Sequence, residues 1–153
     1  MHSPDSTPFR AATHTPPVTC AVEDGVAMLT IHNPPVNAIS GAVRRALWLA
    51  LEDLQTDARV SCVVIAAGGE TFSGGGDLRE LGQPPDPQGV SLGDLAARVE
   101  NFSKPVAIAL QGRAIGGGVL LAMACHARIG AHDTQLALHE AEVDFGQRQL
   151  GVV

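Results

Sequence analysis

Two glycine-rich clusters are the parts of this sequence best suited to do chemistry. Residues 72–77 (FSGGGD) and residues 112–118 (GRAIGGG) each follow a short apolar run. Glycine has no Cβ, so a ligand can approach the main chain closely and meet exposed N–H groups. Donors held in this way are what an oxyanion hole requires. Each cluster taken alone is more simply explained as a tight turn, so the pair has to be weighed together.

Several familiar motifs can be excluded. The second cluster lacks the first Gly-x-Gly of a dinucleotide fingerprint, and neither cluster ends in the Gly-Lys-Ser/Thr of a phosphate-binding loop. Ser73 does not lie in a Gly-x-Ser-x-Gly nucleophile elbow. His139 and Glu140 are not followed by the second histidine of a zinc protease, and no Cys/His spacing predicts a metal site. The remaining candidates for catalytic groups are backbone N–H donors combined with a carboxylate. A nucleotide-binding domain is a disfavoured alternative, because the phosphate motifs are absent.

The elements that would position these clusters alternate between strands and helices. Asp24-Gly25 predicts a hairpin turn between two β-prone segments, and Ser40 stands where a helix N-cap would. This alternation predicts an α/β fold. The expected elements are a hairpin over 18–31, a helix after residue 40 with Arg44 and Arg45 on its polar face, strands at 60–67, 105–110 and 128–131, a loop over 82–93, and a helix from 116 to 125.

The order and spacing of these motifs resemble one family. Residues 33–40 (NPPVNAIS), 72–78 (FSGGGDL) and 104–106 (KPV) leading into 112–118 resemble the crotonase superfamily of enoyl-CoA hydratases and isomerases. The likeness extends from about Val18 to about Glu140 and is greatest to the N-terminal hydratase/isomerase domain of multifunctional fatty-acid oxidation enzymes. It implies a crotonase-like ββα-repeat spiral core, truncated, with a disordered tail over 1–17 and a partial domain over 18–153.

The resemblance also implies roles for individual residues in acyl-CoA chemistry. The N–H groups of Gly76 and Gly117 would bind the thioester oxygen, and Glu140 would be the catalytic carboxylate. The main chain around Ala38, Ile39 and Gly74 would line the coenzyme A path, while Asp77 would shape the loop behind the first donor. Coenzyme A would enter as part of the substrate, with no further cofactor and no metal.

The sequence departs from the family pattern in two places. Leu120 occupies the position of the second glutamate that hydratases use, so the resemblance favours double-bond isomerisation, which needs a single carboxylate, over hydration. His139 replaces a usual proline, and residues 143–153 do not continue the family pattern. The open alternative is a catalytically weak or inactive module that binds acyl-CoA or serves in assembly.

Composition narrows the class of partners. The net charge of -6 and the dispersed basic residues give no footprint for nucleic acid. The cysteines Cys20, Cys62 and Cys125 are read as reduced core thiols, His126 as a packed or helix-end histidine, and Trp48 as a partly exposed helix residue. No long apolar stretch predicts a membrane span. We therefore expect a cytoplasmic protein, and the resemblance implies a homo-oligomer, a trimer or a hexamer.

Overall fold

The computed structural model describes residues 15–138, and the residues on either side are not described. The expected tail over residues 1–17 therefore falls almost wholly outside the described part, as does Glu140. The first element begins at Val18, where the sequence predicts that regular structure starts.

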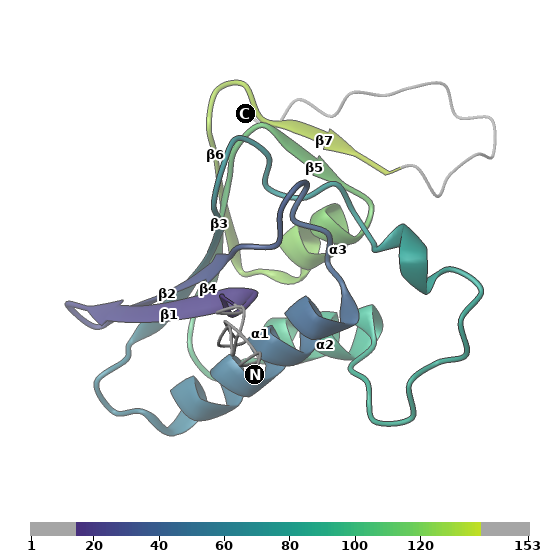
Figure 1. The fold of residues 1–153 in the computed structure, drawn as a ribbon. Helices are drawn as coiled ribbons and strands as arrows, with labels where there is room; N and C mark the ends of the chain where they lie inside the picture. Colours follow the sequence, from purple (N-terminus) through teal and green to yellow (C-terminus); the bar gives the residue numbers. More distant parts are fainter. Residues whose placement is uncertain (1–14, 139–153) are drawn as a thin grey trace, which may run out of the picture.

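A mixed sheet of five strands forms the base of the fold (Figure 1). Its strand order is β1-β2-β3-β4-β6, with β1 antiparallel to β2 and the other neighbours parallel. The strands span Val18–Glu23 (β1), Val26–Ile31 (β2), Cys62–Ala67 (β3), Val106–Leu110 (β4) and Ala127–Gly130 (β6). A separate parallel pair joins β5 (Arg113–Ile115) to β7 (Gln135–Ala137). Parallel neighbours need crossover segments, which here supply the helices.

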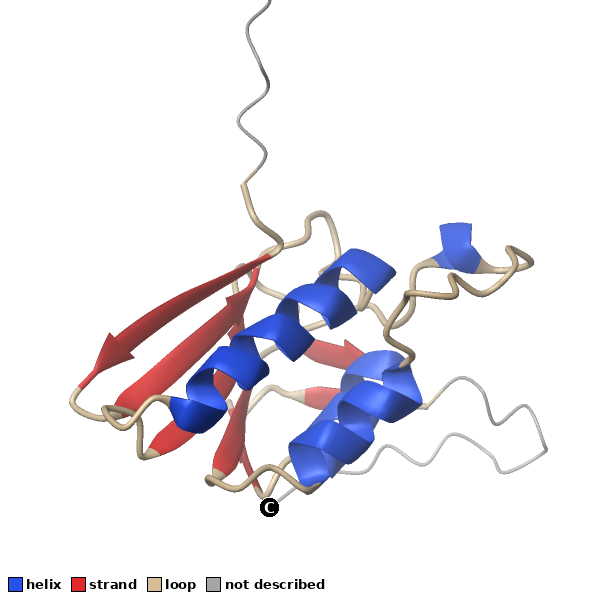
Figure 2. Cartoon of the chain, turned by 90° about the horizontal axis from the view of Figure 1, so that it is seen from below, coloured by secondary structure: helices blue, strands red, loops and turns tan. Residues whose placement is uncertain are grey.

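The helices gather on one side of the large sheet, as Figure 2 shows. They are α1 (Gly41–Thr56), α2 (Leu92–Glu100) and α3 (Gly117–Ala124), with a short 3-10 turn, η1, over Leu78–Glu80. Alternate residues of β2 and β3 are completely buried, and the apolar stripe of α1 packs on them. These fully buried residues are Ala27, Leu29, Ile31, Val63, Ile65, Val43, Leu47 and Leu51. The core therefore lies between the sheet and the helix layer.

Local chemistry explains the first two elements. Asp24 and Gly25 both adopt positive φ, at 48° and 82°, as a tight two-residue hairpin turn requires. The Oγ of Ser40 accepts from the N–H of Val43 and so caps α1. Both predictions are confirmed.

Two cationic side chains from outside the helices, those of Lys104 and Arg128, bind carbonyls at helix C-termini. Nζ of Lys104 donates to Leu54 O and Asp57 O at the end of α1, at 2.6 and 2.7 Å. Nη1 of Arg128 donates to Ala122 O and Cys125 O at the end of α3. Carbonyls in the last turn of a helix are left partly or wholly without intrahelical partners and carry the negative end of the helix dipole, so cations there are favourable.

His126 does the same for α2 as a neutral ring. Its Nδ1 accepts from the N–H of Val106, which leaves Nε2 to donate to Glu100 O at 3.0 Å. The ring therefore joins the end of α2 to the start of β4. The prediction of a helix-end histidine is confirmed, although the residue as a whole is exposed.

Several expectations need correction. The segment that the sequence predicts as a loop through residue 93 ends earlier, because α2 begins at Leu92 with Ser91 as its N-cap. The strand expected from residue 60 begins at Cys62, and the short strands β5 and β7 were not expected. Cys20 is exposed and is not a core thiol, since it lies on the edge strand β1. Cys125 is buried, and that burial raises the pKa of its thiol to about 12.

Candidate functional site

The loop 33–40, which the sequence places beside the coenzyme A path, is held by two asparagines. Asn37 adopts a φ of 49°, is buried, and donates through Nδ2 to Gly68 O at 2.8 Å and Thr71 O at 2.9 Å. Asn33 donates to the carbonyl of Ala38 at 2.9 Å. Asparagine tolerates this left-handed backbone better than most residues and satisfies the buried main chain at the same time.

Main-chain hydrogen bonds attach this loop to the first glycine cluster. The N–H of Gly74 donates to Val36 O, and the N–H of Ile39 donates to Gly75 O, both at 2.7 Å. The two segments approach so closely that a Cβ added at Gly74 would lie 3.0 Å from that of Val36. The structure therefore brings the loop that holds Ala38 and Ile39 next to Gly74, while their part in binding coenzyme A stays a prediction.

The two glycine clusters are joined through Ser73. Its N–H donates to Arg113 O and its carbonyl accepts from the N–H of Ile115, both at 3.0 Å, so that Ser73 pairs with β5 like a strand residue. Its buried hydroxyl accepts from the N–H of Gly75 at 3.1 Å. Ser73 also packs against α3, because a Cβ at Gly118 would lie 2.8 Å from its own. One residue thus sets the spacing of both clusters.

Gly76 and Gly117 come to lie next to each other. A Cβ added at Gly117 would be 3.6 Å from the backbone nitrogen of Gly76, while a Cβ at Gly76 would meet nothing within 4 Å. Within residues 15–138, neither N–H has a hydrogen-bond acceptor. Gly117 is also the first residue of α3, and Gly116 reaches the required φ of 48° at its N-cap. Among the described residues, two neighbouring glycines thus each have an N–H without an acceptor, and that of Gly117 lies at the positive end of a helix.

Asp77 follows the first donor and closes a local turn. Its carboxylate accepts from the N–H and the guanidinium of Arg79, with an ion-pair distance of 2.7 Å. These bonds lower the pKa of Asp77 from 3.8 to about 2. Its carboxylate is thus committed to the start of η1, which agrees with a part in shaping the loop.

Leu120 lies in the first turn of α3 and is 37% exposed, whereas its neighbour Leu121 is completely buried. Glu140, the expected catalytic carboxylate, lies outside the described residues. The structure therefore brings together the two donors and the loop 33–40, and leaves the carboxylate to be tested by experiment.

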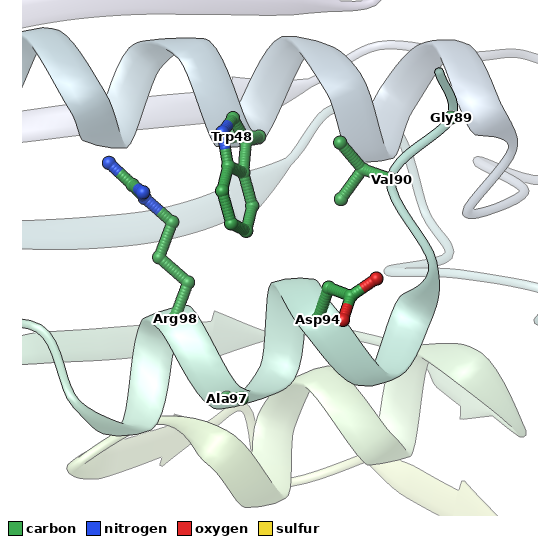
Figure 3. A pocket seen from close by; sticks show the side chains of 6 residues that line it. All are labelled: Trp48, Gly89, Val90, Asp94, Ala97 and Arg98. Carbon is green, nitrogen blue, oxygen red and sulfur yellow. The ribbon is translucent and has the colours of Figure 1, made fainter. Parts of the chain in front are cut away.

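A hollow between α1 and α2 lies apart from these glycines (Figure 3). Its volume is about 500 Å³, and neither Gly76 nor Gly117 lines it. The guanidinium of Arg98 lies 4.3 Å from the centre of the Trp48 ring, so that a cation–π contact joins the two helices. Trp48 is half-buried, as the sequence predicts.

Two further features bear on the class of protein. No group of three or more His, Cys, Asp or Glu side chains within residues 15–138 is arranged to hold a metal ion. Among the helices that the structure describes, none has the length and apolar character needed to cross a membrane.

Arg44 is the residue that the sequence analysis placed wrongly. It was expected on the solvent face of α1, but its side chain is only 18% exposed and donates hydrogen bonds to Ile39, Glu80 and Val90. The sequence analysis also did not single out Asn37 as the residue that holds the loop 33–40. An asparagine next to a turn was an available signal, because asparagine favours such backbone conformations.

Comparison with known proteins identifies the family. The family model for enoyl-CoA hydratase/isomerase matches residues 21–150. A probable enoyl-CoA hydratase of Bacillus subtilis is 42% identical over 128 residues, covering 80% of this chain and 50% of the relative. The peroxisomal bifunctional enzyme of Danio rerio is 42% identical over 119 residues, covering 78% of this chain but 16% of that protein.

The solved structures agree with the sequence relatives. The crystal structure of an enoyl-CoA hydratase/isomerase family member superposes with a TM-score of 0.73 at 28% identity, covering 81% of this chain and 51% of the other. The chain thus spans about half the length of the Bacillus relative and of this structure. The α/β, crotonase-like fold expected from the sequence is confirmed. This chain belongs to the enoyl-CoA hydratase/isomerase family.

Proposed function

We propose that this chain binds an acyl-CoA thioester and polarises it through an oxyanion hole formed by the N–H groups of Gly76 and Gly117. The observation that carries this proposal is the adjacency of these two donors, both without an acceptor among the described residues. The positive end of α3 adds to the stabilisation of a negative oxygen at Gly117. Charge that develops on the thioester oxygen is then stabilised without reorganisation of the site.

The proposed reaction is movement of a double bond by a single carboxylate. Glu140 removes a proton from the carbon next to the thioester, the oxyanion hole stabilises the enolate, and the same carboxylate returns the proton further along the chain. Leu120 offers no second acid or base, so activation of water for hydration is disfavoured. The main chain at Ala38, Ile39 and Gly74 lines the path of coenzyme A, which arrives with the substrate.

The alternative is a module that binds acyl-CoA but turns it over weakly or not at all. Leu120 favours this alternative too, because it removes one of the two carboxylates used in hydration. Both functions share the oxyanion hole and differ only in the use of Glu140.

Two measurements separate these possibilities. Calorimetric titration with butyryl-CoA, free coenzyme A and ADP tests the site itself, and binding that is no tighter for butyryl-CoA than for ADP contradicts the oxyanion hole. Glu140→Gln then tests the chemistry. We expect it to keep acyl-CoA binding and to lower 3-enoyl-CoA isomerisation by roughly a hundred- to ten-thousand-fold. Unchanged turnover in this variant removes Glu140 from the mechanism, and no turnover in either protein favours the binding module.

A further inference from the structure

The guanidinium of Arg44 binds three acceptors, one in the loop 33–40 and two in the segment 77–91. Its Nε donates to Val90 O at 2.7 Å, its Nη1 to Ile39 O at 2.8 Å, and its Nη2 to Oε2 of Glu80 at 3.0 Å. The guanidinium spreads its donors over three nitrogens in one plane, so it reaches acceptors that lie too far apart for the three N–H groups on the single nitrogen of a lysine. Since Arg44 itself lies on α1, the contacts anchor the loop 33–40 and the segment 77–91 to one rigid helix.

Glu80 is held at both carboxylate oxygens. While Oε2 accepts from Arg44, Oε1 accepts from the N–H of Gly41 at 2.6 Å. Gly41 is the first residue of α1, where the free N–H groups and the helix dipole favour an anion. The ion pair between Arg44 and Glu80 is partly exposed, with 18% of the Arg44 side chain and 42% of the Glu80 side chain accessible. Solvent therefore weakens its Coulomb energy, and its importance lies in the geometry that it fixes.

The segment 77–91 depends on these contacts. It includes η1 and projects away from the sheet (Figures 1 and 2), and every residue from 78 to 89 is exposed. A segment with so few buried contacts has little local stability of its own. Arg44 holds it near its start, at Glu80, and again at its end, at Val90.

Two of the three contacts of Arg44, those to Ile39 and Val90, involve residues near the pair of glycine donors. Ile39, whose carbonyl Arg44 binds, donates its own N–H to Gly75 O, next to Gly76. Val90 directly precedes the N-cap of α2, and the first residue of that helix, Leu92, would lie 3.2 Å from a Cβ at Gly117. One side chain is thus connected to each of the two donors through a single further contact.

We propose that Arg44 is a positioning residue of the acyl-CoA site. It fixes the segment 77–91 and the loop 33–40 relative to α1, and thereby sets the access and the alignment of Gly76 and Gly117. The role at the site rests on the proposed function, whereas the anchoring of 77–91 does not.

The chain offers a matched set of variants. Arg44→Met removes all three contacts at similar side-chain length, Arg44→Lys retains the charge without the fork, and Glu80→Gln removes the charge of the pair while keeping an oxygen for Gly41. Arg45→Met is the control, because the neighbouring Arg45 is exposed and makes one long contact to Gln88 O at 3.3 Å. All variants are measured in the full chain, by hydrogen exchange and by titration with butyryl-CoA at matched folded fraction.

For Arg44→Met we expect amide exchange in 77–91 to rise roughly tenfold or more while exchange in the β3 and β4 strands stays unchanged. The dissociation constant of butyryl-CoA should rise about tenfold, since misaligned donors lose part of their interaction with the thioester. For Arg44→Lys we expect an exchange rate and a dissociation constant between those of the unaltered chain and those of Arg44→Met. Arg45→Met should behave as the unaltered chain. Should Arg44→Met fold poorly, Glu80→Gln should still show faster exchange around residue 80.

The outcomes are distinct. Equal exchange in Arg44→Met and Arg45→Met overturns the anchoring of 77–91. Faster exchange with unchanged butyryl-CoA affinity overturns the positioning role alone. An unaltered chain that binds no butyryl-CoA overturns the proposed function and the role at the site together, and the exchange data then still decide whether Arg44 anchors the segment.

Discussion

Gly118→Ala provides the sharpest test of how the two glycine clusters fit together. A Cβ at this position would lie 2.8 Å from Cβ of Ser73 and 3.2 Å from its Oγ, well inside normal contact. Ser73 cannot yield easily, because its N–H and carbonyl both pair with β5 and its hydroxyl binds the N–H of Gly75. Overpacking of this kind costs about 1–3 kcal/mol, and the rigid neighbour puts it near the upper end. The higher helix propensity of alanine returns about 1 kcal/mol.

The expected net loss in free energy of unfolding is therefore about 2 kcal/mol, which lowers the Tm of a chain of this size by roughly 4–8 °C. Chemical and thermal unfolding followed by circular dichroism measure it. Gly93→Ala in α2 is the matched control, since its Cβ would meet only Oγ of Ser91 at 3.7 Å, and we expect it to leave stability unchanged or to raise it. A Gly118→Ala variant as stable as Gly93→Ala would refute the close packing of α3 on Ser73.

Three further predictions follow from the structure. Arg79→Met should raise the pKa of Asp77 from about 2 back toward 3.8, while the pKa of Asp57, which pairs with Arg59, stays at about 2; carboxyl NMR titration measures both groups. The stability that ionised Asp77 contributes above pH 4, and that is lost as pH falls toward 2, should shrink in this variant. Leu120→Glu should raise 2-enoyl-CoA hydration at matched folded fraction, whereas efficient hydration by the unaltered chain would show that Leu120 does not occupy the second carboxylate position. Self-association is expected because Met123 on α3 is 64% exposed and β6 is an edge strand among the described residues, and a monodisperse monomer at high concentration in light scattering would contradict it.

The parts of the fold that local chemistry determines could be predicted from the sequence. Asp24-Gly25 requires positive φ and Ser40 supplies a helix cap, so the hairpin and α1 follow from neighbouring residues alone. The glycine clusters could be located for the same reason. That Gly76 and Gly117 meet was implied only by the family resemblance, because their contact depends on the pairing of Ser73 with β5.

Other parts depend on contacts that sequence patterns do not reveal. Two of the three acceptors of Arg44 lie 36 and 46 positions away in the sequence, so its charge predicted a solvated face and gave no sign of these contacts. Likewise β5 and β7 have three residues each and depend on pairing with distant parts of the chain, β5 with Ser73 and β7 with β5. For α2 a local signal was present, since Ser91 caps the helix and accepts from Asp94 N, but the proline-rich segment before it concealed where the loop ends.

The attachment of Ser73 to β5 has a consequence for how such a site can change over generations. The positions of the two glycine clusters depend in part on the main-chain hydrogen bonds between Ser73 and β5, which any side chain at position 113 and any residue except proline at position 115 would leave in place. Side chains on β5 can therefore change over generations without displacing Gly76 and Gly117. A frame of this kind lets the surroundings of a site vary while the positions of its backbone groups stay fixed.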